Sequence, residues 1–101
     1  MATETYFVNG QKFMWDKDKN LQNLQKHGVL FREATYVFQD VNAMIFIDEE
    51  HSHDEERFKI IGNSNKDRLL TVIHCYRNSE SVIRIISARK ATRMEVNDYV
   101  R

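Results

Sequence analysis

The sequence predicts a small α+β domain, in which an antiparallel β-sheet arranged as a meander carries helices packed on one face. Three observations support this fold class. An Asn-Gly dipeptide divides two apolar-rich runs near the N-terminus, two segments with helical spacing follow, and four strand-like segments joined by short polar links precede a final helix. The chain has 101 residues and no proline, so a single domain over residues 1–101 is expected, without a rigid linker.

The N-terminal hairpin is predicted from its turn. Asn9-Gly10 lies between the runs 5–8 and 11–15, and Asn-Gly favours a two-residue hairpin turn because both of its positions take positive φ. A two-stranded ribbon is therefore expected at the start of the chain.

Two helices are predicted after the hairpin. Asp16 can cap the first-turn amides of a helix that runs to about residue 26, and Gly28 suits the left-handed position that follows such a helix. A shorter helix is expected over residues 31–38, from apolar residues at helical spacing. Its N-cap position holds Leu30, which cannot accept a hydrogen bond, so this helix should begin less firmly.

Four strands and one helix are predicted in the remainder of the chain. Their links are short and polar, as hairpin turns are, which implies antiparallel neighbours. In the final helix, Thr92 and Glu95 have the spacing of a capping box. The expected strands are residues 43–48, 57–62, 69–76 and 81–88, and the helix is residues 92–101. The periodicities predict a core that contains Trp15, Leu21, Leu24, Phe38, Phe46, Phe58, Ile60, Leu70, Val72 and Ile85.

Composition narrows the classes of function. No apolar run approaches the roughly 20 residues that cross a bilayer, and the single cysteine, Cys75, excludes an internal disulfide. We therefore expect no membrane contact and a cytoplasmic location. Residues 1–56 hold five Lys and Arg against eleven Asp and Glu, whereas residues 57–101 hold ten against four. These halves allow one basic face that meets phosphates, unless folding intermixes them.

The residues offer little support for a metal or cofactor site. His51 and His53 could face one ion if their segment were extended, but nothing fixes a third ligand, and a polar loop is the favoured interpretation. The three glycines form no nucleotide-binding loop, and Cys75 lies in the most apolar strand, where it is expected to be inert. No metal and no cofactor are therefore expected.

Basic side chains on the predicted strands are the best candidates for chemistry. Arg57 and Lys59 alternate on one side of a strand, Arg84 interrupts the apolar run 83–86, and His74 lies in another apolar strand. Arginines fixed on strands stabilise charge that develops on phosphate oxygens, and histidine transfers protons near neutral pH. The competing interpretation is structural: Arg84 and His74 pack within the sheet and bond nearby carboxylates.

Several segments, in order along the chain, resemble the BrnT family. They are Phe13-x-Trp15-Asp16, Asn20-x-x-Asn23-Leu24-x-Lys26-His27-Gly28-Val29-x-Phe31-x-Glu33-Ala34, His51-Ser52, Glu56-Arg57-Phe58-x-x-Ile61-Gly62, Arg68-Leu69-Leu70 and Ile83-Arg84-Ile85-Ile86-Ser87-Ala88-Arg89-Lys90-Ala91-Thr92. The last segment is the most specific, and the resemblance covers about residues 13–99. Leu30 departs from it where the family often has a capping Ser or Thr, and Arg32 where the family often has an acidic residue.

The resemblance implies a bacterial or archaeal type II toxin: an endoribonuclease with a RelE-like fold, neutralised by a BrnA-like antitoxin that carries a ribbon-helix-helix domain. The expected complex is 2:2, because that DNA-binding domain dimerises. The expected reaction is metal-independent RNA cleavage that inhibits translation, in which the 2′-hydroxyl attacks the adjacent phosphate. We assign catalysis to Arg57, His74, Arg84 and Arg89, and RNA binding to Lys59, Lys90 and Arg93. The alternative is a non-catalytic module that binds RNA or a protein through the same basic residues.

Overall fold

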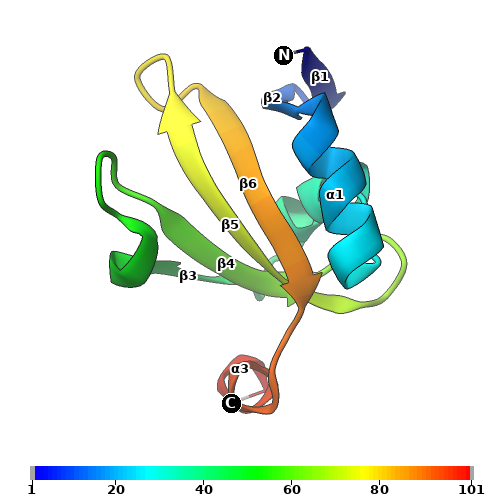
Figure 1. Ribbon diagram of the computed structural model, residues 1–101. Helices are drawn as coiled ribbons and strands as arrows, with labels where there is room; N and C mark the ends of the chain where they lie inside the picture. Colours follow the sequence, from blue (N-terminus) through cyan, green and yellow to red (C-terminus); the bar gives the residue numbers. More distant parts are fainter. Residues whose placement is uncertain (1, 101) are drawn as a thin grey trace.

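The computed structural model describes residues 2–100, which form one six-stranded sheet and its helices (Figure 1). The strands lie in the order β1-β2-β6-β5-β4-β3. In chain order the elements are β1 (Thr3–Val8), β2 (Gln11–Asp16), α1 (Lys17–His27), α2 (Phe31–Thr35), the 3₁₀ turn η1 (Tyr36–Gln39), β3 (Met44–Ile47), the 3₁₀ turn η2 (Glu49–His51), β4 (Phe58–Asn63), β5 (Leu69–Arg77), β6 (Val82–Lys90) and α3 (Arg93–Tyr99). The predicted α+β class is confirmed.

The predicted sheet was antiparallel throughout, whereas the observed sheet is mixed. Strands β3 to β6 pair antiparallel in the expected meander, and β1 pairs antiparallel with β2. However, β2 pairs parallel with β6, with Lys12 opposite Val82 and Met14 opposite Arg84. The hairpin therefore extends the sheet next to its last strand. This pairing joins segments about 70 residues apart, so no turn in the sequence announces it.

The turn and capping residues identified in the sequence lie at the ends of the elements, as predicted. Asn9 and Gly10 both have positive φ, 47° and 83°, as the hairpin turn requires. Asp16 accepts a hydrogen bond from the Asp18 amide at 2.9 Å, and Gly28 follows α1 in the left-handed region. Leu30 has N-cap backbone geometry without a side-chain cap, also as expected.

The two faces of the sheet differ in what covers them. Successive side chains on a strand point to opposite faces, so Leu70 and Val72 lie on one face and Thr71 on the other. The first, here called the covered face, packs against residues from α1 to η1, namely Val29, Phe31, Ala34 and Val37. The second, here called the basic face, carries Lys59, Thr71 and Arg89 and receives α3, because Glu95 bonds Thr71. Figure 1 shows α3 well separated from α1. The prediction of helices on one face therefore does not extend to α3.

The core agrees in part with its prediction. Trp15, Ile60, Leu70, Val72 and Ile85 are buried, and Phe38 is partly buried against them, whereas Leu21, Leu24 and Phe46 are exposed. The inward position on α1 belongs instead to a polar residue. The Asn23 amide donates to the carbonyls of Val29 and Ala88, both at 2.8 Å, and accepts from the Ala88 N–H. These three bonds fix α1 to β6 without a leucine stripe. No helix within residues 2–100 is long and apolar enough to cross a membrane.

Candidate functional site

The basic face brings together four of the predicted site residues. Arg57 directly precedes β4 and Lys59 lies within it, whereas Arg84 and Arg89 come from β6, two strands away. β5 lies between them and contributes its Thr71 side to the same face.

A break in the pairing of β6 puts both of its arginines on this face. Arg84 and Arg89 are five residues apart, which in a regular strand would point them to opposite faces. The register shifts between His74 and Ile73, and Ile86 is left without a partner on β5. Such a bulge reverses the alternation. Arg84 therefore pairs with Cys75 and Arg89 with Thr71, and Cys75 and Thr71 share a face because they are four residues apart.

Glu95 of α3 is the centre of the charge network at one margin of this face. Its carboxylate accepts two hydrogen bonds from the Arg89 guanidinium, at 2.7 and 3.1 Å, and one from the Thr71 hydroxyl at 2.7 Å. The Lys59 ammonium lies 3.4 Å from it, and the Thr92 N–H completes the capping box. Burial raises the pKa of Glu95, but the bonds from Arg89, Thr92 and Thr71 outweigh it and hold the pKa far below its usual range. Glu95 therefore stays ionised and neutralises part of the basic charge.

Glu55 holds a second network, at the opposite margin of the face. Its carboxylate lies 2.8 Å from the Arg77 guanidinium and 3.8 Å from that of Arg57. The hydrogen bond from Arg77 holds the pKa of Glu55 below its usual range. The Arg57 Nε is buried and has no hydrogen-bond partner among residues 2–100. Arg57 is thus oriented on one side only and keeps unused donor capacity.

The segment between β3 and β4 presents an exposed histidine beside this margin. His51 Nδ1 lies 2.7 Å from Asp48 Oδ2, with the His51 side chain about half exposed and Asp48 mostly buried. The Ser52 hydroxyl fixes the segment, because it donates to the Asp48 carbonyl and accepts from the Arg57 N–H. A carboxylate that orients an accessible imidazole is the arrangement of a general base. The sequence had suggested His51 only as a weak metal ligand.

His74 lies on the other side of the sheet from the arginines. It is fully buried on the covered face, where the rings of Phe38, Phe58 and Tyr76 surround it at centroid distances of 4.8 to 6.0 Å. Its Nε2 has no hydrogen-bond partner among residues 2–100. Burial lowers the pKa of His74 from 6.5 to about 4. The structure does not bring His74 to the basic face, because the side chain shares the phase of Leu70 and Val72.

The remaining predicted cations differ in how they are held. Within residues 2–100, no carboxylate pairs with Arg84, Lys90 or Arg93, so their charges stay available. The same part of the chain holds no group of three His, Cys, Asp or Glu residues placed for a metal ion. Acidic and basic halves of the sequence also mix, since Glu33 pairs with Arg68 and Glu55 with Arg77. These ion pairs bring acidic residues of the first half next to basic residues of the second, so the two halves do not form two oppositely charged surfaces.

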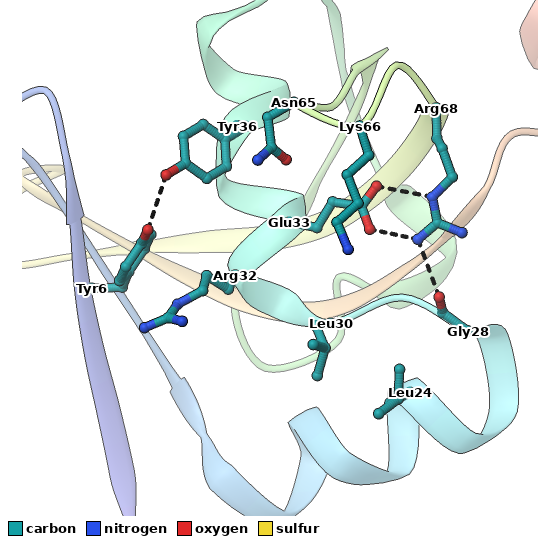
Figure 2. Close-up of a pocket in the computed structure, with 10 residues that line it drawn as sticks. All are labelled: Tyr6, Leu24, Gly28, Leu30, Arg32, Glu33, Tyr36, Asn65, Lys66 and Arg68. Atoms are coloured by element: carbon teal, nitrogen blue, oxygen red, sulfur yellow. Dashed lines mark hydrogen bonds and ion pairs between the residues drawn. The ribbon is translucent and has the colours of Figure 1, made fainter.

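A pocket of about 190 Å³ lies away from the basic face, in the layer that α1 and α2 form over the covered face (Figure 2). Leu24 and Leu30 form its apolar wall, and Tyr6 and Tyr36 face each other with their hydroxyls 2.9 Å apart. The Arg32 guanidinium stacks over the Tyr6 ring, 4.8 Å from its centroid. Sequence reasoning missed this pocket, because its walls come from β1, α1, α2 and the link after β4.

The comparisons with known proteins agree with one another. A family model described as "Ribonuclease toxin, BrnT, of type II toxin-antitoxin system" matches residues 15–95. The crystal structure of the Brucella abortus ribonuclease toxin BrnT superposes with a TM-score of 0.60 at 25% sequence identity, over 78% of this chain and 94% of that one. No curated protein matches the chain.

Proposed function

The chain belongs to the BrnT family of type II toxin–antitoxin ribonuclease toxins, and from this premise we propose that it cleaves RNA on its basic face without a metal ion and thereby inhibits translation. The proposal rests on one observation: Arg57, next to β4, and Arg84 and Arg89 of β6 share the face of the sheet that receives α3, opposite the covered face. In the proposed reaction the 2′-hydroxyl loses its proton and attacks the adjacent phosphate, the bond to the 5′-oxygen breaks while that oxygen takes up a proton from water, and a 2′,3′-cyclic phosphate forms. Negative charge grows on the phosphate oxygens during this step, so fixed guanidinium donors accelerate it.

Arg57 and Arg84 are the best candidates for the phosphate contact. Arg84 has no carboxylate partner within residues 2–100, and the partly exposed Arg57 guanidinium is only loosely paired, with Glu55 at 3.8 Å. Arg89 and Lys59 are held by Glu95, so we assign them a role in positioning the side chains of the basic face. Their partly neutralised charges would attract the phosphate backbone of the RNA less strongly than free cations do. Lys90 ends β6 opposite Leu70 and so has the phase of the covered face, and Arg93 begins α3. Both cations would guide the RNA strand past the end of β6.

For proton transfer we propose His51 in place of His74. Its imidazole is exposed, and Asp48 holds it in one orientation. A proton acceptor must reach the 2′-hydroxyl of a bound strand, which a group buried on the opposite face does not do. Asp48 would also stabilise the imidazolium that forms when the 2′-hydroxyl loses its proton.

The partners follow from the same family. We propose that the antitoxin is BrnA-like, dimerises through a ribbon-helix-helix domain and forms a 2:2 complex in the cytoplasm. It should cover part of the basic face, at or beside Arg57, Arg84, Arg89 and Lys90, so that RNA is excluded. Its association should slow at high salt. The acidic residues Asp48, Glu49, Glu50 and Asp54 should lie outside this contact. Light scattering of the purified complex measures the stoichiometry.

A non-catalytic module that binds RNA or protein is the second candidate. It is favoured by the neutralisation of Arg89 and Lys59 by Glu95, which leaves fewer cations for catalysis. The two candidates predict different behaviour of a variant that removes the proton acceptor. Cleavage would be lost with binding intact under the first candidate, whereas under the second there is no cleavage to lose.

The experiment measures cleavage of purified cellular RNA in the presence of EDTA, and reporter synthesis in a cell-free translation system. We expect Arg84→Ala and His51→Ala to lower cleavage roughly 100-fold or more, with RNA affinity reduced much less by His51→Ala. His53→Ala and Lys17→Ala are matched controls, since both residues are exposed and neither belongs to the proposed site. Wild-type protein that leaves RNA and translation untouched would contradict the proposal, and activity restored only by added metal would contradict its metal independence.

A further inference from the structure

The pocket in the helical layer carries an excess of positive charge that the proposed reaction does not use. Arg32, Lys66 and Arg68 line it, against the single carboxylate of Glu33. Glu33 is itself fully engaged, because it accepts from the Arg68 Nε at 2.9 Å and from the Ser64 hydroxyl at 2.6 Å. Figure 2 shows Arg32 extending toward Tyr6, away from this pair. Two cations at the pocket are thus free to meet carboxylates from outside.

The same pocket has two partly exposed leucines in its wall. Leu24 is 40% exposed and Leu30 is 37% exposed, and both line the pocket. Leu21, one helical turn before Leu24, is 51% exposed and extends the stripe along α1. Apolar side chains gathered at a hollow with a charged rim are typical of a protein contact.

Leu30 adds an independent observation, because it occupies a position where leucine weakens the helix. It is the N-cap of α2, and its side chain makes no capping bond. A Ser or Thr there would stabilise the helix, because its hydroxyl would accept a hydrogen bond from a first-turn amide. Violations of a local rule without local compensation are expected at functional positions.

The hollow is small and has a larger neighbour. The first pocket offers about 190 Å³, enough for one bulky side chain. A second hollow of about 400 Å³ shares Tyr6, Leu30 and Arg32 with it. The two adjoining hollows are here called the groove, and a peptide segment that places one side chain in the first and continues over the second would contact both.

We propose that this groove anchors the antitoxin of the proposed toxin–antitoxin pair and helps to select the cognate one. The antitoxin segment would insert one large apolar side chain beside Leu24 and Leu30 and place a carboxylate opposite Arg32. The inference rests on the proposed function for the identity of the partner. The groove and the proposed RNA site are different places on the molecule, because the groove lies over the covered face and the RNA site lies on the basic face.

The test measures dissociation constants between the full chain and its purified antitoxin, the product of the neighbouring gene, for Leu30→Ser and Arg32→Glu. Each variant should weaken binding roughly tenfold or more, mainly through faster dissociation. Cleavage of RNA by each variant should stay within about twofold of the wild-type rate. The matched controls are Val41→Ser, which removes a fully exposed apolar side chain, and Lys17→Glu, which reverses a charge outside the groove. Neither control should change the affinity.

Each outcome decides the inference. Unchanged antitoxin affinity in both variants overturns it, and so does weaker RNA binding with intact antitoxin affinity, which would make the groove an RNA site. Misfolding does not explain a loss in Leu30→Ser, because the new hydroxyl caps α2 and urea unfolding should show stability at or above wild type. If the wild type cleaves no RNA, the proposed reaction fails while the affinity measurement still reports on the groove.

Discussion

The covered face and the basic face are built by the same strands and stabilised in different ways. On the covered face, Phe31, Leu70 and Val72 are fully buried, and the stabilising term is removal of apolar surface from water. On the basic face, Arg89 and Lys59 converge on Glu95, and the stabilising term is the pairing of charges. The stability of the covered face therefore depends on how well its apolar side chains fit together, and that of the basic face on how its charges are paired. Substitutions should therefore separate the two faces into one that controls stability and one that controls activity.

The comparison also explains where a polar residue is costly. His74 on the covered face has aromatic neighbours and an unpartnered Nε2, so its protonation is disfavoured. Glu95 on the basic face is almost as buried, yet three hydrogen-bond donors and Lys59 favour its charged form. Equal burial thus gives opposite outcomes, according to the partners that the neighbouring strands supply.

The largest effect should come from the covered face. Phe31→Ala removes a fully buried ring that packs edge-on against Trp15, so we expect a loss of roughly 3–5 kcal/mol in the free energy of unfolding. The control is Ile45→Ala on β3, whose side chain is half exposed and should cost well under 1 kcal/mol. Urea unfolding followed by tryptophan fluorescence measures both. Similar losses in the two variants would contradict the contrast between the faces.

The next effect is a pH dependence that originates at His74. Its folded-state pKa of about 4 lies below the ordinary 6.5, so between these values the unfolded chain binds more protons than the folded one. Stability is therefore complete above pH 6.5 and falls as the pH approaches 4, by on the order of 3 kcal/mol. His74→Leu should remove this slope, while the carboxylates with lowered pKa values keep theirs at lower pH. Parallel stability curves for the two proteins across pH 4–6.5 would refute the assignment.

A smaller effect, of opposite sign for stability and binding, is expected on the basic face. Glu95→Gln leaves Arg89 and Lys59 without their carboxylate, which should cost roughly 1–3 kcal/mol of stability. The freed cations should bind RNA more tightly and with a steeper salt dependence. Chemical unfolding and titrations with labelled single-stranded RNA at two salt concentrations measure these changes. Glu80→Gln, in an exposed turn, is the control, and equal RNA affinity in the two variants would count against the network.

The smallest effect concerns Leu30, which belongs to neither face. Leu30→Ser should raise the free energy of unfolding by roughly 0.5–1 kcal/mol, because the hydroxyl can accept a bond from a first-turn amide of α2. Thermal unfolding measures the gain. A matched Leu30→Ala variant shortens the side chain without supplying an acceptor and should show no gain. An equal loss of stability in Leu30→Ser and Leu30→Ala would mean that the packing of the leucine side chain stabilises the fold more than a capping hydroxyl does.

The sequence predicted those parts of the fold that depend on residues close together in the chain. Asn9-Gly10, Asp16 and Thr92 each act within a few residues, and each has the predicted geometry. The pairing of β2 with β6 depends on residues about 70 apart, and the apolar patterns of β2 and β6 fit several neighbours equally well. The inward Asn23 was also missed, because its three hydrogen bonds need the backbone of Val29 and Ala88 already in place.

The common face of Arg84 and Arg89 agrees with the prediction and the position of His74 does not, whereas the roles assigned to these residues stay predictions. Alternation along 69–76 already put His74 in phase with Leu70 and Val72, both expected in the core, so the pattern itself opposed a place beside the arginines. Arg84 and Arg89 were grouped correctly although their spacing alone opposes it, because the unpaired Ile86 could not be foreseen. His51 needed the three-dimensional position of Asp48 to stand out from an acidic loop.

The parallel contact between β2 and β6 has a consequence for how the molecule reaches its native state. Lys12 cannot pair with Val82 until most of the chain has left the ribosome. The N-terminal hairpin therefore joins the sheet only after β6 has been synthesised. Loop closure over such a separation is slow, and mixed topologies rich in distant contacts fold in roughly milliseconds to seconds. Premature termination before β6 would leave β2 as an unpaired edge. A nascent chain therefore completes its sheet only after β6 has been made, which delays any toxicity until synthesis is nearly finished.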